Sequence, residues 1–395
     1  MITKILFVAS SPETVGYLSG LQESQKESLE FFFENNCVDA LKSISENNIS
    51  IVITDFRIPK FNYQDFFNLL QMNYPRIFRL SLASSHEKDN VLRLSKSIHR
   101  YVKLPLSKCE LLKTINDLIK LLSTEIDAEL VEKINGLGPI PILPEIYLRL
   151  EKEISRSTFS MNRIAEIIQS DPLMVARLLH IAHSSFYSIP TGISNLLQAL
   201  TFLGVDVIKT LVLYVKIFSL KNVSPETQSL LKEIKAHSIN VAKLSKAIMQ
   251  KETDDKKMIE LAYISGLLHD IGKIILLQLN DKEQHQSYLT NIRSGESYRI
   301  EMDLFGVSHV KIGAYILRLW GLNDTIIEAV ASHHDKSLLD GNTLALKEIV
   351  YIANVFSHEI DERASSISES YGTQRFDQWD QLFKEDIRPA LNLSL

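Results

Sequence analysis

A histidine and an aspartate stand next to each other inside an apolar run of this chain. The run covers residues 261–273 and reads LAYISGLLHDIGK, which places the pair at His269 and Asp270 and a lysine at Lys273. Burying an imidazole beside a carboxylate is costly unless a partner or a cation satisfies both groups. The helical spacing of the surrounding apolar residues therefore predicts a helical domain built around a polar site.

Four further histidines flank this pair. His237 lies upstream, and His309, His333 and His334 lie downstream. One histidine in an apolar helix is usually a hydrogen-bonded core residue, but several around a His–Asp pair are typical of a metal site. Two interpretations stay open at this point: a metal centre, or a polar core in which His269 and Asp270 bond each other and the backbone.

The first 122 residues follow a different pattern, in which short apolar runs alternate with amphipathic segments. We expect strands at residues 4–9, 28–33, 49–54, 77–82 and 98–103. We expect helices near residues 13–22, 38–46, 63–72, 87–95 and 108–122. Apolar strands separated by helix-length segments predict a parallel sheet covered on both faces, here an α/β flavodoxin-like doubly wound domain.

The pattern becomes helical after a proline-rich stretch at residues 136–144, and the motif Ser170-Asp171-Pro172 has the composition of a helix start. A chain of 395 residues is long for one core, so several domains are expected. We predict the α/β domain at 1–122, a linker or connecting helix at 123–135, an all-α helical domain at 136–360, and a partly helical tail at 361–395.

The first domain resembles the receiver domain of two-component response regulators over its whole length. The segments IVITDFRIP at 51–59 and YVKLP at 101–105 carry this resemblance. It implies that Asp55 is the phospho-acceptor, with Mg²⁺ as cofactor if the receiver is active. The acidic pair that holds Mg²⁺ in that family is replaced by Ala9, Ser10 and Ser11, and Leu104 separates the lysine from the proline. Residual phosphorylation of Asp55 and a purely structural role for it both stay open.

The helical part resembles the HDOD domain, a relative of the HD-domain phosphohydrolases, over roughly residues 131 to 335. The motifs lie at residues 143–147, 171–182, 185–187, 199–204, 266–273, 309–314, 320 and 333–334. The resemblance implies a divalent cation such as iron or manganese, and Lys273 as a candidate phosphate contact. The implied ligands are His237, His269, Asp270, His309 and His333.

Two departures weaken the catalytic interpretation. Asn354 stands where the catalytic relatives carry a last metal-binding aspartate, and no Gly-Tyr-Pro signature follows the second pair of histidines. An amide oxygen is a poorer ligand than a carboxylate. We therefore assign no catalytic residue and favour a non-catalytic role, with hydrolysis left open.

Charge and cysteine content narrow the choice of partners and location. A net charge of -5 gives no general attraction to nucleic acid or to an anionic membrane. The two cysteines, with no secretory signal pattern after the first methionine, predict a cytoplasmic protein without a disulfide framework.

The resulting first hypothesis is a bacterial signal-transduction regulator in which a receiver-like domain controls a mostly non-catalytic HDOD domain. Its output would be protein–protein contact, with signalling proteins such as a histidine kinase as partners and a homodimer as an expected assembly. The alternative is a metal-dependent phosphodiesterase or phosphohydrolase acting on a nucleotide or cyclic dinucleotide. A third option is a sensor that binds a cyclic dinucleotide without cleaving it.

Overall fold

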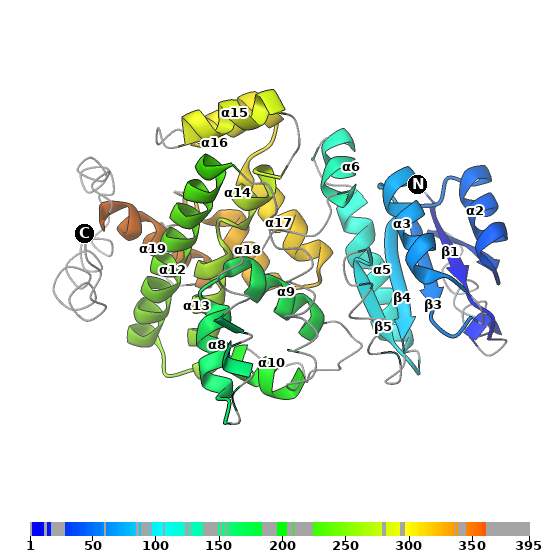
Figure 1. The fold of residues 1–395 in the computed structure, drawn as a ribbon, viewed down its shortest axis with the longest axis horizontal. Coiled ribbons are helices and arrows are strands. Elements are labelled where there is room, and N and C mark those ends of the chain that lie inside the picture. The colour runs from blue at the N-terminus through cyan, green and yellow to red at the C-terminus, as the bar shows by residue number, and fades with distance from the viewer. Residues whose placement is uncertain are drawn as a thin grey trace. The chain divides into compact units, whose positions relative to one another are not determined.

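The computed structural model in Figure 1 divides the chain into two compact units, the first built on Met1–Pro139 and the second on most of the remaining residues. The described residues are 2–11, 14–16, 28–58, 61–83, 87, 94, 97–105, 107–122, 126, 128–136, 149–150, 152–154, 156, 158–183, 196–203, 208, 224–278, 282–292, 297–335, 337–338 and 345–360. The expected tail at 361–395 lies outside these residues, as do most of the expected helices at 13–22 and 87–95.

A five-stranded parallel sheet forms the centre of the first unit. The strands are β1 (Thr3–Val8), β2 (Leu29–Glu34), β3 (Ile51–Asp55), β4 (Phe78–Ala83) and β5 (Arg100–Lys103). Their order is β2-β1-β3-β4-β5, and every neighbouring pair runs parallel. The sequence pattern predicted all five strands to within two residues. Strands β3 and β4 are buried along their whole length and β1 nearly so, whereas β2 is only partly buried.

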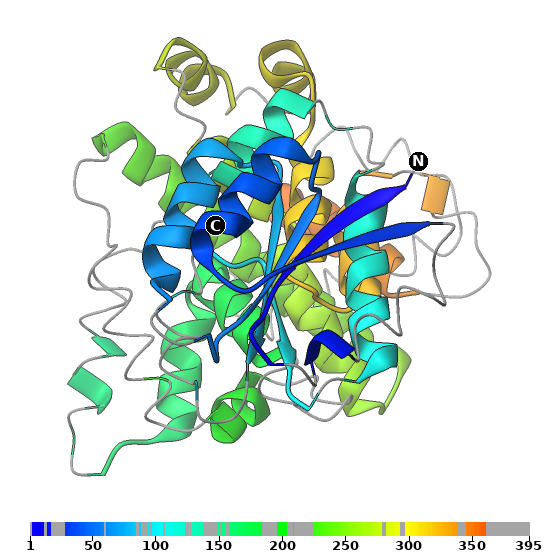
Figure 2. The ribbon, with the colours of Figure 1, turned by 90° about the vertical axis from the view of Figure 1, so that its right-hand side faces the viewer.

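Helices cover both faces of this sheet. Figure 2 shows α2 (Cys37–Glu46) and α3 (Tyr63–Asn73) on one face and α5 (Lys108–Leu122) on the other. The side chains of Asn36 and Asn62 cap α2 and α3 by accepting a hydrogen bond from a backbone N–H of the first turn. These helices agree with the expected segments, so the α/β prediction is confirmed at the level of a parallel sheet with helices.

The predicted connecting segment contains α6 (Ala128–Gly136), which packs on the first unit. The guanidinium of Arg76 lies 2.8 Å from a carboxylate oxygen of Glu132, and the buried Arg79 donates to the carbonyl of Asn135 at 3.0 Å. Because α6 forms both a surface ion pair and a hydrogen bond with a buried arginine of the first unit, it is part of that unit.

The described residues of the second unit form helices and no strand, which confirms its helical prediction. The helices are α8 (Met161–Gln169), α9 (Pro172–His183), α10 (Leu196–Leu203), α12 (Pro225–Glu252), α13 (Lys256–Leu268), α14 (Ile271–Leu276), α15 (Lys282–Asn291), α16 (Ser297–Phe305), α17 (His309–Leu319), α18 (Asp324–Ser332) and α19 (Leu346–Ile360). The Asp171 carboxylate accepts from the N–H groups of Leu173 and Met174, so the predicted start of α9 is confirmed. Among the described residues, no helix is both long enough and apolar enough to cross a bilayer.

The long helix α12 packs closely against α13, and a glycine makes this approach feasible. A Cβ atom built on Gly266 would lie 2.8 Å from the Cα of Ala242 and 2.8 Å from the carbonyl oxygen of Val241. Contacts this short with backbone atoms leave no room for a side chain. The close crossing brings the end of α13, and with it His269 and Asp270, next to the middle of α12 where His237 lies.

Candidate functional site

Separate helices bring the predicted metal ligands of the second unit together. His237 comes from the middle of α12, and His269 and Asp270 form the junction between α13 and α14. His309 is the first residue of α17, and His333 follows the end of α18. Chain segments almost 100 residues apart therefore meet at one point.

The carboxylate of Asp270 lies at the centre of this group. Its Oδ1 atom is 3.3 Å from Nε2 of His309 and 3.5 Å from Nε2 of His333. Its Oδ2 atom is 3.4 Å from Nε2 of His269 and 3.9 Å from Nε2 of His237. Asp270, His269, His309 and His333 are buried, so these groups face each other rather than water.

Hydrogen bonds on the far side of three rings fix which nitrogen carries the proton. Nδ1 of His269 lies 2.7 Å from the carbonyl of Gly266, and Nδ1 of His333 lies 2.7 Å from the carbonyl of Val330. Nδ1 of His309 lies 2.6 Å from a carboxylate oxygen of Glu301. Because each of these partners accepts a hydrogen bond, Nδ1 holds the proton and Nε2 presents a lone pair toward Asp270.

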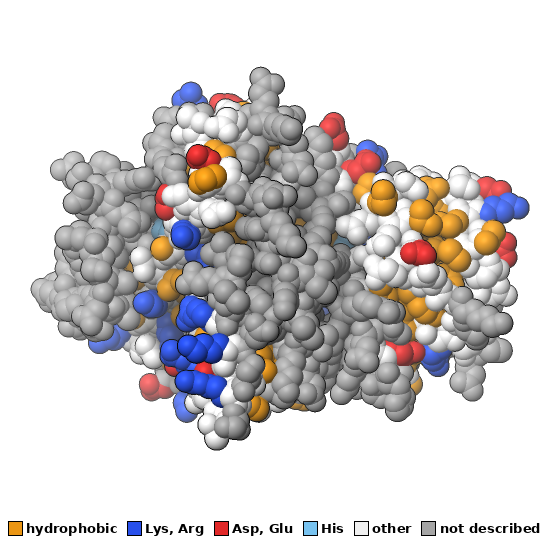
Figure 3. Space-filling model, in the orientation of Figure 1, with side chains coloured by type: hydrophobic (Ala, Val, Ile, Leu, Met, Phe, Trp, Pro, Cys, Tyr) orange, Lys and Arg blue, Asp and Glu red, His pale blue; other side chains and the backbone are white. Residues whose placement is uncertain are grey.

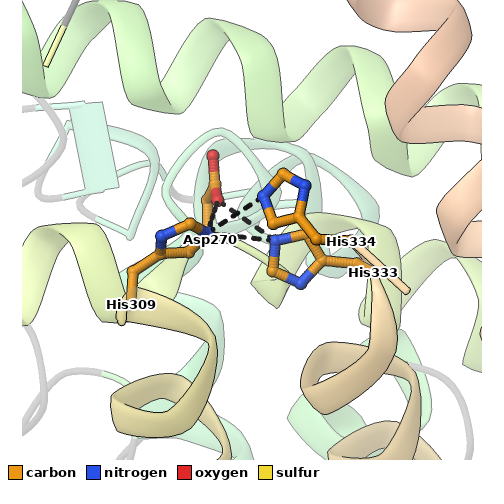
Figure 4. A group of neighbouring side chains, drawn as sticks. All are labelled: Asp270, His309, His333 and His334. Atoms are coloured by element: carbon orange, nitrogen blue, oxygen red, sulfur yellow. Dashed lines mark hydrogen bonds and ion pairs between the residues drawn. The ribbon is translucent and has the colours of Figure 1, made fainter. Parts of the chain in front are cut away.

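Lone pairs that face each other across short distances repel each other unless a cation lies between them. Figure 4 shows the four-residue cluster of Asp270, His309, His333 and His334. Nε2 of His309 lies 3.2 Å from Nε2 of His333 and 3.2 Å from Nε2 of His334. The buried atoms Nε2 of His269 and Oδ1 of Asp270 have no hydrogen-bond partner. Imidazole nitrogens and one carboxylate are the donors that Fe, Mn or Zn takes, so these residues fit a divalent cation.

His237 has a different role from the other histidines. The side-chain N–H of Asn354 donates to the carbonyl of His333 at 3.4 Å, which turns the amide oxygen of Asn354 toward His237. That oxygen lies 3.0 Å from Nε2 of His237, so Nε2 is the protonated nitrogen. Nδ1 of His237 then accepts from the hydroxyl of Ser357 at 3.1 Å. His237, His269 and Asp270 form a second group of candidate ligands, whose donor atoms lie within 4.8 Å of one another. In this structure Nε2 of His237 donates to Asn354 instead of offering a lone pair to that group.

Lys273 lies against the cluster rather than in open solvent. Its Nζ atom donates to Oδ2 of Asp270 at 2.7 Å, and 11% of its side chain is exposed. Burial opposes the ionisation of Asp270, but Lys273 and His269 overcome it and hold the pKa of Asp270 well below its ordinary value. Burial, followed by the charge of Lys273, lowers the pKa of His309 well below its ordinary value, and burial also lowers the pKa of His333. An ionised Asp270 carboxylate therefore faces the neutral imidazoles of His309 and His333.

Glu301, on α16, supports the cluster from behind and did not emerge from the sequence. One oxygen, Oε2, accepts from the backbone N–H of His309 at 2.7 Å and from its Nδ1 at 2.6 Å. The other, Oε1, accepts from the hydroxyl of Tyr288 at 2.9 Å. Burial, above all, raises the pKa of Glu301 to about 7. No motif marked this residue, because a glutamate eight positions before a histidine has no fixed relation to it until the helices pack.

The predicted phospho-acceptor of the first unit is already paired inside the protein. Asp55 is 1% exposed at the end of β3. The guanidinium of Arg57 donates to Oδ1 at 2.9 Å and to Oδ2 at 2.7 Å, and it also reaches the hydroxyl of Thr14 at 2.8 Å. The hydroxyl of Ser81 donates to the carbonyl of Thr54, so it is engaged with the backbone. The guanidinium of Arg57 thus supplies a positive charge at the carboxylate beside which the receiver resemblance implies Mg²⁺ if the receiver is active.

Comparison with protein families adds a decisive observation on the second unit. The family model described as HDOD domain matches residues 140–336. The chain contains an HDOD domain. The predicted ligands all lie within that domain, whereas Asn354 and Ser357 come from α19, beyond its matched end.

Relatives of the HDOD-containing chain are distant. An uncharacterised protein from Treponema pallidum (strain Nichols) is 23% identical over 217 residues, which are 54% of this chain and 40% of that protein. Ribonuclease Y from Sulfurovum sp. (strain NBC37-1) is 31% identical over 99 residues, which are 25% of this chain and 14% of that protein. The chain thus spans less than half the length of either relative.

Among solved structures, the MmoQ response regulator from Methylococcus capsulatus str. Bath has a similar fold. The TM-score is 0.50 at 16% identity, over 61% of this chain and 97% of that chain. At this identity the likeness concerns the fold alone. The roles of the individual residues in the HDOD domain therefore depend on the geometry described above, and the predicted ligand set stays a prediction.

Proposed function

We propose that this protein is a signalling regulator in which a receiver-like domain controls an HDOD domain that binds one divalent cation and acts through protein contacts. Within the four-residue cluster, Asp270, His309, His333 and His334 would hold the cation. When bound, such a cation can act as a Lewis acid toward water or phosphate. The chain's own residues orient the imidazoles and keep the carboxylate ionised.

The observation that carries this proposal is the bond between His237 and Asn354. Nε2 of His237 carries the proton of this bond and offers no lone pair, which leaves only His269 and Asp270 of the second candidate ligand group. Hydrolysis of phosphate esters commonly uses two cations that stabilise the attacking and the leaving oxygen. A centre with donors for one cation is better suited to a structural or sensory role than to turnover.

Elemental analysis of the purified full chain, together with a phosphodiesterase and phosphohydrolase screen, tests the proposal. We expect close to one equivalent of iron, manganese or zinc per chain and no turnover above a His309→Ala variant. Turnover that depends on the metal would contradict the non-catalytic role. Absence of any bound metal, even after reconstitution, would contradict the cation site.

The receiver-like domain is expected to resist phosphorylation. Arg57 neutralises Asp55 and covers both carboxylate oxygens, and no carboxylate is available at residues 9–11 to hold Mg²⁺. We therefore expect no Asp55 adduct when the protein is incubated with acetyl phosphate and Mg²⁺ and analysed by intact-mass spectrometry. A stoichiometric adduct that disappears in Asp55→Asn would show that Arg57 yields to phosphate and that the domain is an active receiver.

Control by protein contact is supported by apolar side chains on the surface of the first unit. Val38 on α2 is 75% exposed and Met72 on α3 is 79% exposed, with Leu69 on α3 also exposed. Figure 3 shows hydrophobic side chains gathered on the visible face of this unit. Exposed apolar groups on neighbouring helices are the kind of surface that a signalling partner or a second copy covers.

The second candidate function is the metal-dependent phosphodiesterase. A surface pocket of about 490 Å³ favours it, because Ser308, Lys311 and His334 contribute to its lining. His334 belongs to the four-residue cluster, so a ligand in this pocket would lie beside the cation. The size suits a mononucleotide. Calorimetry with nucleotides and cyclic dinucleotides, alongside the turnover screen, separates cleavage from binding without cleavage.

A further inference from the structure

We propose that Glu301 is a positioning residue that fixes His309 as a nitrogen donor to the cation, and that Tyr288 holds Glu301 in the orientation this requires. The inference rests on the cation site of the proposed function and adds to it a residue pair outside the predicted ligands. It assigns a role to two buried polar side chains, on α15 and α16, that the cluster itself does not include.

One oxygen of the Glu301 carboxylate makes both of its contacts with a single residue, His309. A single oxygen, Oε2, receives both the backbone N–H and the ring Nδ1 of His309, at 2.7 and 2.6 Å. The backbone contact fixes the first residue of α17, and the ring contact fixes the rotation of the imidazole about its axis. Together they leave Nε2 of His309 as the only ring nitrogen that can face Asp270, 3.3 Å away.

Burial and the second oxygen explain why Glu301 is not itself a ligand. The side chain is 0% exposed, and Glu301 is the only buried residue of α16. Its Oε1 atom accepts from the Tyr288 hydroxyl at 2.9 Å, and Tyr288 is also 0% exposed. With both oxygens engaged, the carboxylate cannot turn toward the cluster without leaving a buried group unpaired, which is costly.

A carboxylate on the far nitrogen of a coordinating histidine raises the basicity of the ring and fixes its tautomer. Outer partners of this kind contribute about 10- to 100-fold to metal affinity. A helix cap, in contrast, needs only the backbone contact. The ring contact of 2.6 Å, shorter than the backbone contact, is the feature that a purely structural cap does not require.

The test uses the full chain and Co²⁺ as the probe, with affinity measured by titration calorimetry. Glu301→Gln keeps the shape of the side chain and removes its charge, and we expect it to weaken Co²⁺ binding by about 10- to 100-fold. Tyr288→Phe should weaken it less, because Glu301 keeps its contacts with His309. Asp303→Asn is the matched control on the same helix, since Asp303 is largely exposed and its nearest pairing is a surface contact of 3.8 Å with Arg299.

Nitrogen-15 NMR of the metal-free protein, with histidine labelling, gives a readout that does not depend on the cation. We expect His309 to show the Nδ1–H tautomer with a strongly downfield proton in the wild type, moved upfield in Glu301→Gln as the bond to a charged acceptor is lost. Thermal unfolding of each variant separates a loss of affinity from a loss of fold.

The two proposals fail in different ways. A wild-type chain that does not bind Co²⁺ would overturn the cation site, while the tautomer of His309 would still decide the role of Glu301. Normal Co²⁺ binding by a folded Glu301→Gln variant, within twofold of Asp303→Asn, would overturn the positioning role. So would an Nε2–H tautomer of His309 in the wild type.

Discussion

Replacing Gly272 by alanine is expected to destabilise the helical unit by about 3 kcal/mol or more and to separate His309 from Asp270. A Cβ atom on Gly272 would lie 1.9 Å from the carbonyl oxygen of His309, 2.7 Å from its carbonyl carbon, and 2.9 Å from the backbone nitrogen of Gly313. All three are backbone atoms, so no side-chain rotation can relieve the overlap. The start of α14 would have to move away from the start of α17, and these two helix ends carry the carboxylate and an imidazole of the cluster.

Gly313→Ala is the matched control for this substitution. Its Cβ atom would meet Val330 Cγ1 at 3.2 Å and the backbone nitrogen of Gly272 at 3.4 Å, and small shifts of a side chain can accommodate this. We expect the control to cost about 1 kcal/mol or less. Chemical denaturation, followed by circular dichroism of the helices, gives the free energy of unfolding of each variant. A Gly272→Ala chain as stable as Gly313→Ala would mean that α14 and α17 do not approach as closely as described.

The architecture was predictable because its signals are local. Strands such as Thr3–Val8 and Ile51–Asp55 are short, mostly apolar runs, and buried parallel strands of this kind need no partner in the sequence to be recognised. The start of α9 was predictable for the same reason, since Asp171 and Pro172 act within one turn. A connecting helix was expected, but its packing on the first unit depends on Arg79, whose long side chain reaches Asn135 across 56 residues.

The sequence predicted which residues gather at the site, but it did not predict the hydrogen bonds between them. Resemblance to a family supplied His269, Asp270 and His309, which the fold does bring together. The tautomers, however, follow from contacts such as that of Asn354 with His237, 117 residues apart. Arg57 is only two residues from Asp55, yet the sequence does not tell whether its side chain turns back onto the carboxylate or out into solvent.

His334 belongs to the four-residue cluster but was not among the predicted ligands. It stands beside His333, and the resemblance to HD-type proteins placed only His333 among the predicted ligands. Because the two residues lie in the turn after α18 rather than within the helix, both rings face the same cluster. A turn can therefore place consecutive side chains on one cation, which neither a helical nor a strand period would predict.

Asp270→Asn is expected to weaken cation binding in the second unit on the order of 100-fold or more, which is a larger loss than that of an outer partner. Asp270 is shared by both groups of candidate ligands and is the only carboxylate in either. The amide has the same shape, so packing is preserved while the single negative donor is lost. Calorimetric titration with Co²⁺ measures the change, and Asp303→Asn at the surface again serves as the control for an acid-to-amide exchange.

The same substitution should also destabilise the metal-free protein, because Lys273 loses its carboxylate. Removing one partner of a buried ion pair costs about 3–5 kcal/mol, most of it from the charge left without a counterpart. If the unpaired charge of Lys273 causes this loss, removing that charge should restore stability. The double variant Asp270→Asn with Lys273→Met should then be more stable than Asp270→Asn alone. Chemical denaturation of the four chains of this cycle measures the coupling. A double variant no more stable than Asp270→Asn would assign the loss to the imidazoles around Asp270 instead of to Lys273, whose ammonium lies 2.7 Å from the carboxylate.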